Sequence, residues 1–405
     1  MTSPICQFCG APLTQTFADL GTTPLCESYV EVAARNRPEP FYVLHAFVCG
    51  QCFLVQVEEL EKAENIYSDY AYFSSYSDSW LQHARNYVEM VVARFDLKPP
   101  QQIIEIASND GYLLQYFVAR GFPVLGVEPA ANIAAVAEKK GIPAVVKFFG
   151  ERTARELPVQ ADLLIGNNVL AHVPRLNDFV RGLQIALKPA GVLTMEFPHL
   201  MRLIAENQFD TIYHEHFSYL SLLTVEKIFG AHGLELFDVE ELPTHGGSLR
   251  IYACHPGAHP RSPRVAELQV REVAAGLTRL ETYGEFTEQV KETKRKLLEF
   301  LIAAKRDGKT VVGYGAPGKG NTLLNYCGIK TDFLDYTVDR SPYKQGRLLP
   351  GSRIPIFHPD KIRETKPDFV LILPWNLKTE IMQQMAYIRE WGGQFVVPIP
   401  ELRVC

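Results

Sequence analysis

Two blocks of the chain alternate short apolar segments with helix-like segments, and this alternation restricts the fold more than any other feature. In the first block the apolar segments are QIIEIA (102–107), PVLGV (123–127), ADLLIG (161–166) and GVLTMEF (191–197). In the second block they are KTVVGYG (309–315), FLDYTVD (333–339), FVLILP (369–374) and QFVVPI (394–399). Strands that alternate with helices of this length favour parallel sheets. We therefore predict an α/β protein with a parallel, doubly wound sheet and a second, smaller α/β unit behind it.

The composition and residue spacing of the remaining chain indicate three domains. Residues 1–65 are irregular and punctuated by cysteine, whereas residues 262–305 have the amphipathic spacing of long helices. A chain of 405 residues is also too long for one ordinary hydrophobic core. We expect an N-terminal cysteine-containing module (1–68), a central Rossmann-like domain (69–255) and a C-terminal α/β Rossmann-like domain (256–405).

Composition excludes several classes of protein. Hydrophobic residues make up 47% and charged residues 21% of the chain, which is ordinary for a globular enzyme. A formal net charge of −5 disfavours a nucleic-acid binder. No apolar run reaches the roughly 18–20 residues that cross a bilayer, and the N-terminus does not resemble a secretory signal. We expect a cytoplasmic protein with reduced cysteines, no membrane partner and, for want of an extended apolar interface helix, a monomeric state.

Two C-x-x-C pairs lie near the N-terminus. They are Cys6 with Cys9 and Cys49 with Cys52. Four thiolates from two such turns can surround Zn²⁺ tetrahedrally and leave no open coordination position. The segment between the pairs is longer than in common zinc ribbons, so it would form a looped-out insertion. We predict a structural zinc site, with a redox dithiol or a chance pairing as the alternative.

The apolar segment at 103–106 leads into a turn of small and polar residues and then a helix. Such a turn lets the backbone approach a ligand at the carboxyl edge of a sheet. The next strand ends at Glu128, whose carboxylate can accept two hydrogen bonds from a ribose diol. NAD sites share this pattern, but the absence of G-x-G-x-x-G here favours S-adenosylmethionine, which has no pyrophosphate. The alternative is an ordinary turn with a surface glutamate.

Three further polar segments can contribute to a site. Asn167 and Asn168 follow a predicted strand and should face the same crevice, and His172 either lines that crevice or caps the next helix. Residues 210–219 are not an H-E-x-x-H zinc motif, because the second histidine would fall on a phenylalanine. A histidine there can act as a base near neutral pH, although a polar surface turn is the alternative. The glycine-bearing loop 243–250 can close over a substrate.

Several segments are similar, in order and over nearly the whole chain, to those of one enzyme family. They are CQFCG, CGQC, YSDYAYFSSYSDSW, EIASNDGYLL, GVEPAANIA, NNVLAHV, EFPHL, DTIYHEHFSYLSL and THGGSLRIY. Together they resemble the sugar 3-C-methyltransferases, which act on nucleotide-linked 4-keto-deoxysugars. The resemblance implies a zinc-binding N-terminal module, a central class I methyltransferase domain that binds S-adenosylmethionine, and a C-terminal domain that helps to enclose the nucleotide sugar.

The resemblance also implies roles for individual residues. His216 would be the base that removes the C3 proton, with Tyr213 and Glu215 beside it and His172 close to the reaction centre. The C3 carbanion would then attack the methyl group of the cofactor. The expected cofactor-binding residues are Glu105, Ala107, Ser108, Asn109, Asp110, Gly111, Glu128, Asn132, Asn167 and Asn168. The expected substrate-binding residues are Tyr67, Tyr70, His245 and Lys319, and the family's usual nucleotide is thymidine diphosphate (dTDP).

The chain departs from the family's pattern at one position of the cofactor turn. Relatives tend to have EIGSNDG, whereas this chain has Ala107 in place of the glycine. Alanine can take most conformations with negative φ. We therefore expect the cofactor still to bind.

A G-x-G-x-x-G pattern at 313–318 follows a predicted strand, and Asp339 ends the next one. Taken alone, this pattern favours an NAD-dependent oxidoreductase. The family resemblance instead implies that the loop faces the substrate, with Lys319 near phosphates or sugar, or that it serves the fold only. A third possibility is a zinc-ribbon scaffold whose two α/β domains have lost activity.

Overall fold

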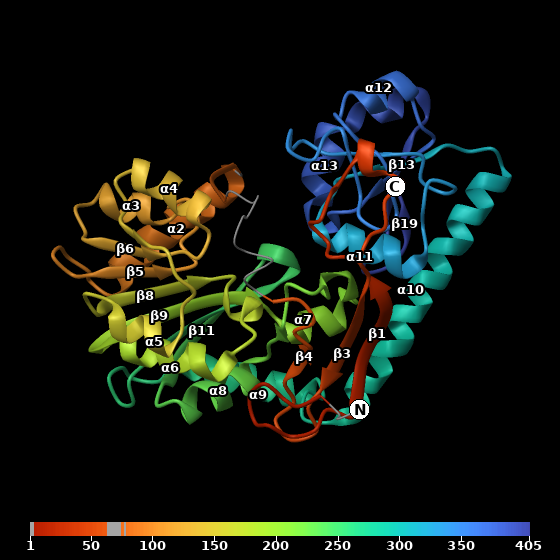
Figure 1. The fold of residues 1–405 in the computed structure, drawn as a ribbon. Coiled ribbons are helices and arrows are strands. Elements are labelled where there is room, and N and C mark those ends of the chain that lie inside the picture. Colours follow the sequence, from red (N-terminus) through yellow and green to blue (C-terminus); the bar gives the residue numbers. More distant parts are fainter. Residues whose placement is uncertain (1–3, 63–73, 77) are drawn as a thin grey trace. The chain divides into compact units, whose positions relative to one another are not determined.

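The computed structural model describes residues 4–62, 74–76 and 78–405 (Figure 1). The chain divides into two compact units. The first comprises residues 1–13, 49–200 and 217–278, and the second comprises 14–48, 201–216 and 279–405. Each unit is therefore assembled from segments that are far apart in sequence. The three-domain division with boundaries after residues 68 and 255 stays a prediction. Among the helices in the described ranges, none is long and apolar enough to cross a membrane.

The first unit is built on a seven-stranded sheet with the order β11-β12-β9-β8-β5-β6-β7. The strands are β5 (Ile103–Ile106), β6 (Val124–Val127), β7 (Ala144–Val145), β8 (Ala161–Asn167), β9 (Leu187–Pro198), β11 (Glu235–Leu242) and β12 (Ser248–Cys254). Strands β7, β6, β5, β8 and β9 pair in parallel. The four apolar segments of the first block are thereby confirmed as the parallel strands β5, β6, β8 and β9.

Two antiparallel strands extend this sheet at one edge, which the prediction of a parallel sheet did not include. Strand β12 pairs antiparallel with both β9 and β11. Only residues 243–247, with the 3-10 turn η5 (Thr244–Gly246), connect β11 to β12. A connection this short makes a hairpin, because a parallel crossover needs about a dozen residues or more.

Helices flank the sheet of the first unit. They are α2 (Asp78–Arg94), α3 (Leu114–Val118), α4 (Ala131–Lys139), α5 (Glu151–Glu156), α6 (Leu176–Ala186), α8 (Leu222–Ala231) and α9 (Pro263–Ala274), with 3-10 turns η2 (Ser74–Tyr76) and η3 (Leu170–His172). The short strands β4 (Val55–Val57) and β10 (Ser218–Tyr219) pair antiparallel in the same unit. Helix α2 packs Tyr87, Val88 and Val91 into the core beside Phe117. Because both faces are covered, all four residues of β5 are buried.

The second unit contains a six-stranded sheet with the order β16-β14-β13-β17-β18-β19. The strands are β13 (Val311–Tyr314), β14 (Thr337–Val338), β16 (Ile356–Phe357), β17 (Phe369–Ile372), β18 (Gln394–Val397) and β19 (Arg403–Val404). All pair in parallel except β19, which is antiparallel to β18. In chain order this is the 3-2-1-4-5-6 arrangement of doubly wound folds. The second α/β unit is confirmed, although only Thr337 and Val338 of the predicted strand 333–339 are extended.

Helices and strand pairs complete the second unit. Strand β1 (Gln15–Thr23) pairs antiparallel with β3 (Tyr42–Val48), and β2 (Val30–Glu31) with β15 (Arg347–Leu348). The helices are α10 (Leu280–Arg306), α11 (Gly318–Cys327), α12 (Lys361–Thr365) and α13 (Lys378–Gln384), with 3-10 turns η1 (Val32–Ala34), η4 (Phe209–Thr211), η6 (Trp375–Leu377) and η7 (Ala386–Trp391). Helix α7 (Leu200–Ala205) begins at the last residue of segment 49–200 of the first unit and continues into segment 201–216 of the second. The helical spacing predicted over 262–305 corresponds to α9 and α10.

Aromatic packing joins β1 to the long helix α10. Phe17 stacks on Phe286 with ring centroids 4.6 Å apart and contacts Tyr283 edge-on at 6.0 Å. All three side chains are fully buried. This cluster therefore attaches an N-terminal strand to the C-terminal part of the chain.

Replacement of Phe17 by alanine is expected to destabilise the protein by about 3–5 kcal/mol, because it removes a buried ring and leaves a cavity. Denaturant unfolding followed by circular dichroism measures the change. Phe41→Ala is the matched control, since Phe41 is 49% exposed in the same stretch of chain. Equal midpoints for the two variants would show that the Phe17 cluster contributes nothing particular to stability.

Candidate functional site

The four cysteines of the two C-x-x-C pairs come together in the first unit. Their Sγ atoms all lie within 4.8 Å of one another. The Sγ atoms of Cys6 and Cys52, and those of Cys9 and Cys49, are 3.5 Å apart. Zn–S bonds of about 2.3 Å place the sulfurs of a tetrahedral site about 3.8 Å apart. None of the four is in a disulfide, so the set fits a closed structural zinc site.

Both cysteine turns use a left-handed residue directly after the second cysteine. Gly10 has φ 74° and Phe53 has φ 64°. The Gly10 amide donates to the carbonyl of Cys6, and the Phe53 amide to that of Cys49, each at 3.0 Å. Glycine takes this conformation freely, whereas a residue with a Cβ loses roughly 1–2 kcal/mol. The second turn therefore keeps Phe53 in a left-handed conformation that costs free energy of folding, as is common around a metal site.

The predicted cofactor turn is held by Glu128, at the end of β6. One carboxylate oxygen accepts from the Asn109 amide and the other from the Ala130 amide, both at 3.0 Å. Burial raises the pKa of Glu128, and the two backbone N–H groups act against that rise. Each oxygen has a second lone pair. The carboxylate can therefore orient the turn and still accept hydrogen bonds from a ribose diol.

The expectation of a negative φ at Ala107 is wrong. Ala107 has φ 54°, Asn109 has φ 49° and Gly111 has φ 75°. The chain must reverse directly after β5 while the Ala107 amide still donates to the carbonyl of Val127 at 2.8 Å. Asparagine tolerates this region better than other side chains, but alanine does not. Ala107 therefore holds a strained backbone conformation, at a cost of roughly 1 kcal/mol relative to glycine.

Buried polar atoms without partners gather at this edge of the sheet. Within the described residues, Glu105 Oε2, Ser108 Oγ, Asp110 Oδ1 and Asn167 Oδ1 are buried and accept or donate no hydrogen bond. Burial raises the pKa of Glu105, with Glu128 and Asp110 adding to it. An unsatisfied buried polar group costs about 1–3 kcal/mol. A polar ligand such as S-adenosylmethionine would satisfy these groups, so the residues present fit that cofactor.

Three further predicted residues of the first unit lie in the segments that follow strands β6 and β8. Asn168 follows β8 with φ 54° and donates its amide to the carbonyl of Glu196 at 2.8 Å. Asn132 lies in the first turn of α4. His172 ends η3 and does not cap the next helix, because the N-cap of α6 is Arg175.

His216 and Tyr213 form a hydrogen-bonded pair in the second unit. The Nδ1 atom of His216 lies 2.9 Å from the carbonyl oxygen of Thr211, and Nε2 lies 2.9 Å from the hydroxyl of Tyr213. A carbonyl can only accept, so Nδ1 carries the proton and Nε2 is the basic nitrogen. Both side chains are partly exposed. This arrangement presents the basic nitrogen of a histidine in a fixed tautomer.

Glu215 is buried and points to a different partner. The Cys26 thiol donates to its Oε1 at 3.3 Å. Burial raises the pKa of Glu215 to about 7, Glu27 adds to the rise, and Cys26 and Lys344 oppose it. Near neutral pH this carboxyl group is therefore able to donate as well as accept a hydrogen bond. The sequence showed Cys26 only as an ordinary cysteine, since the two residues lie far apart in the chain.

Lys319 lies at the start of α11, in a polar cluster of the second unit. Its Nζ is 3.0 Å from Oδ1 of Asn376 and 4.7 Å from the ring centroid of Trp375. The Trp375 indole donates to Asp210 Oδ2 at 2.8 Å. Burial raises the pKa of Asp210 to about 7 and lowers that of Lys319. Trp375 and Asn376 were missed from the sequence, although they follow the predicted strand 369–374 at its carboxyl end.

The G-x-G-x-x-G loop adopts the turn that its glycines predict. Gly315 has φ 92°, and a Cβ there would lie 2.5 Å from Pro374 Cδ. Asp339 accepts from the Ala316 amide at 2.7 Å and from the Ser341 amide at 2.8 Å. Glu128 makes the same kind of hydrogen bonds at the cofactor turn. In both sheets, therefore, a carboxylate at the end of the second strand binds a backbone amide of the turn after the first strand.

His245 lies in η5 with φ 55°. Its ring meets the indole of Trp80 edge-on at 5.3 Å, within the first unit. Tyr67 and Tyr70, also predicted to bind substrate, lie outside the described residues. The sequence therefore predicted His245 but missed its contact with Trp80. Trp80 belongs to the same tyrosine-rich segment as Tyr67 and Tyr70.

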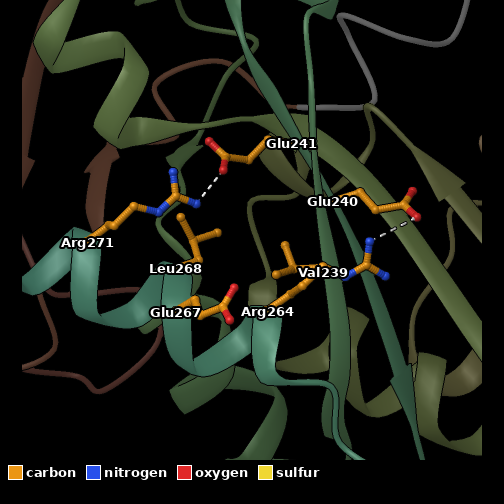
Figure 2. Close-up of a pocket in the computed structure, with 7 residues that line it drawn as sticks. All are labelled: Val239, Glu240, Glu241, Arg264, Glu267, Leu268 and Arg271. Carbon is orange, nitrogen blue, oxygen red and sulfur yellow. Dashed lines mark hydrogen bonds and ion pairs between the residues drawn. The ribbon is translucent and has the colours of Figure 1, made fainter.

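A pocket in the first unit lies between β11 and α9, away from the predicted residues (Figure 2). Its charged side chains face one another: Arg271 pairs with Glu241, and Arg264 with Glu240 at 3.7 Å. No predicted site residue lines this pocket. Because these arginines already have carboxylate partners, the pocket does not indicate an anion site.

The zinc site predicts about one tightly bound Zn²⁺ per chain, measured by inductively coupled plasma mass spectrometry. Cys9→Ser is expected to lose the metal and to lower the melting temperature, because three thiolates hold zinc less well than four. Cys405→Ser is the matched control, since Cys405 is an exposed free cysteine outside the cluster. The prediction would be contradicted if wild-type protein lost its zinc to a chelator and kept the same melting temperature as before.

Glu128→Gln is expected to weaken S-adenosylmethionine binding by about 10-fold to 100-fold, because it removes charge-assisted hydrogen bonds to the ribose. Isothermal titration calorimetry measures the dissociation constant. Glu138→Gln on α4 is the control with the same change of charge at an exposed position. If both variants bind the cofactor as the wild type does, Glu128 is not a ribose ligand.

Family comparisons divide the chain in the order expected from its sequence. Residues 6–67 match a zinc binding domain family, residues 80–239 a methyltransferase domain family, and residues 243–400 the family of C-methyltransferase C-terminal domains. The first match includes all four clustered cysteines, and the second includes the cofactor turn and Glu128.

Solved structures resemble part of the chain only weakly. The PH0226 protein from Pyrococcus horikoshii OT3 is 15% identical, with a TM-score of 0.37, over 48% of this chain and 99% of its own. The magnesium protoporphyrin IX methyltransferase ChlM from Synechocystis PCC 6803, with bound SAM, is 16% identical, with a TM-score of 0.34, over 43% of this chain and 79% of its own. These scores are too low to add to the argument.

A curated relative, by contrast, matches nearly end to end. The C-methyltransferase NovU from Streptomyces niveus is 36% identical over 403 residues, which cover 98% of this chain and 96% of the relative. This match includes the zinc-binding cysteines, the cofactor turn and the C-terminal sheet. The chain therefore belongs to the family of S-adenosylmethionine-dependent C-methyltransferases that carry an N-terminal zinc-binding domain.

Proposed function

We propose that this enzyme methylates C3 of a nucleotide-linked 4-keto-deoxysugar, with thymidine diphosphate as the nucleotide. The similarity to a C-methyltransferase over 98% of the chain supports the reaction class. The sugar and its nucleotide come from the motifs that resemble sugar 3-C-methyltransferases. A keto group at C4 makes the C3 proton acidic enough for removal by a positioned base.

The observation that carries this proposal is the fixed tautomer of His216. Its Nδ1 proton is donated to the Thr211 carbonyl, so Nε2 can take a proton once the Tyr213 hydroxyl turns to another acceptor. In our proposal Nε2 takes the C3 proton, and the C–H electron pair moves into an enolate on the C4 oxygen. Tyr213 or His172 then donates a hydrogen bond to that oxygen.

The cofactor supplies a methyl group on a sulfonium, which is an electrophile with a neutral leaving group. The C3 carbon of the enolate forms the new C–C bond as the S–CH₃ bond breaks, and the ketone is restored. Glu128, Asn109 and the strand-end residues hold the cofactor in place for this transfer. His216 afterwards releases the proton to solvent. The keto sugar and S-adenosylmethionine thus give the C-methylated sugar, S-adenosylhomocysteine and one proton, and no other co-reactant is needed.

Residues of the second unit are proposed to hold the nucleotide sugar. Lys319 offers a cation at the first turn of α11, and Asn321 at the end of that turn is buried with neither amide atom hydrogen-bonded inside the described ranges. A diphosphate or sugar hydroxyl would satisfy both groups. Glu215, with its pKa near 7, is proposed to contact the sugar beside His216, and His245 is proposed as a further substrate-binding residue.

The arrangement of Asp339 keeps one rival function open to test. Because it matches the ribose-binding arrangement of doubly wound sheets, a dinucleotide at the C-terminal loop would imply oxidation of a nucleotide sugar. Calorimetry with NAD⁺ and NADH decides between the two functions. The proposed methyl transfer requires that neither binds at millimolar concentration.

His216→Asn is expected to lower the rate of methyl transfer at least about 100-fold, because it removes the general base while keeping a polar side chain of similar reach. The C3 proton of the keto sugar should also stop exchanging with solvent deuterium, measured by proton NMR without cofactor. His358→Asn is the control in the same unit, since His358 is exposed. Near wild-type exchange and turnover by His216→Asn would refute its assignment as the base.

A panel of nucleotide-linked 4-keto sugars tests the substrate class. Mass spectrometry is expected to detect a gain of one methyl group on a 4-keto sugar and none on the corresponding 4-hydroxy sugar, which cannot form the enolate. Cofactor binding without methylation of any keto sugar would overturn the proposed substrate class.

A further inference from the structure

A second histidine lies at the carboxyl edge of the sheet in the first unit. His83, on α2, places Nε2 at 2.9 Å from Oε2 of Glu196. The His83 side chain is 19% exposed and that of Glu196 is 1% exposed. Glu196 lies near the end of β9 and is paired in register with Asn167 at the end of β8. Ligands of open α/β sheets bind at this edge.

The Glu196 carboxylate is ionised and held in place. Arg250 Nε donates to its Oε1 at 2.7 Å, which leaves Oε2 to His83. Burial alone would raise the pKa of Glu196, but His83 and Arg250 together hold it below its usual value. A carboxylate can only accept, so Nε2 of His83 is the donor, and in the neutral form of the ring Nδ1 is the acceptor. Such carboxylate–histidine pairs orient functional imidazoles.

The plane of the His83 ring is fixed by Trp80. The two rings are stacked, with centroids 4.8 Å apart and planes inclined by 14°. The same indole lies 6.1 Å from the ring of Tyr112, which follows the cofactor turn, and meets His245 edge-on. Across the part of the chain that the structure describes, Nδ1 of His83 has no hydrogen-bond partner. The imidazole is thus held by Glu196 at Nε2 and by Trp80 on one ring face, with Nδ1 unused.

The position along the sheet separates a sugar ligand from the cofactor. The ribose carboxylate Glu128 ends β6, and the sheet order from there is β6, β5, β8, β9. At about 4.8 Å between strands, β9 lies about 14 Å from β6. The edge of β9 is therefore on the far side of the cofactor turn from Glu128, and His83 lies away from the predicted ribose site.

We propose that His83 is a substrate-binding residue whose Nδ1 accepts a hydrogen bond from a hydroxyl group of the nucleotide sugar. Glu196, Arg250 and Trp80 position it. The proposal rests on the proposed function for the identity of the ligand. It differs from the proposed roles of His216 and His172, because His83 recognises the sugar and takes no proton from C3.

Two substitutions separate this role from a purely structural one. In His83→Gln the amide reaches the position of Nε2 and keeps the bond to Glu196, but Nδ1 is lost. In His83→Asn the amide occupies the position of Nδ1, but the bond to Glu196 is lost. Steady-state kinetics with the keto sugar, cofactor affinity by calorimetry and melting temperature are measured for both variants and for His358→Gln as control.

His83→Gln is expected to raise KM for the nucleotide sugar and lower kcat/KM about tenfold, the effect of one hydrogen bond, with unchanged cofactor affinity. His83→Asn should retain more kcat/KM than His83→Gln. The reverse order, or wild-type kcat/KM for His83→Gln, would overturn the proposal and leave His83 as a partner of Glu196 only. If the melting temperature shows that one variant is unfolded, the affinity of the other variant for the nucleotide sugar is measured by calorimetry. That affinity then decides whether His83 binds the sugar.

Failure of the proposed function has a different signature. In that case the wild-type chain itself neither methylates nor binds any keto sugar, whereas failure of the His83 proposal leaves the wild type active and His83→Gln equally active.

Discussion

The predicted cofactor turn depends on one buried carboxylate. Glu128 accepts hydrogen bonds from the amides of Asn109 and Ala130, which joins the turn after β5 to the end of β6. That tie helps to hold three left-handed residues in one short turn against their conformational cost, together with the hydrogen bond from the Ala107 amide to the Val127 carbonyl. Asp339 makes the same two kinds of bond in the second unit, to the turn after β13 and to Ser341. One device therefore shapes the ligand edge of both sheets.

The proposed chemistry depends on the acceptor that each histidine meets, because that acceptor decides which ring nitrogen carries the proton. The Thr211 carbonyl makes Nε2 the basic atom of His216, and the Glu196 carboxylate makes Nδ1 the acceptor of His83. The neighbouring carboxyl of Glu215 is pushed toward neutrality by burial, with its pKa near 7. Donors and acceptors are thus assigned before any ligand binds, which lowers the reorganisation needed during reaction.

Several of these features reduce stability. Ala107 holds a positive φ, Glu105 and Asn167 leave buried oxygens unsatisfied, and Lys319 is buried enough for its pKa to fall. Each costs of the order of 1 kcal/mol or more. Such costs concentrate at binding sites because a ligand, and not the protein, completes the hydrogen bonds. Buried apolar clusters, such as Phe17 of β1 packed on Phe286 and Tyr283 of α10, offset these costs.

The sequence alone indicated the parallel strands β5, β6, β8 and β9, the strands β13, β17 and β18 of the second sheet, the four clustered cysteines and the cofactor turn with Glu128, and it predicted a reactive segment around His216. These depend on local periodicity, on spacing within a turn and on motifs, all of which can be seen in a single chain. The tertiary structure decided what depends on distant partners. It set the sign of φ at Ala107, the antiparallel hairpin β11–β12, the pairing of Cys26 with Glu215 and the tautomers. It also joined residues 14–48 to the C-terminal sheet. Packing brings such residues together across long separations, and no local pattern records which acceptor a buried side chain will meet.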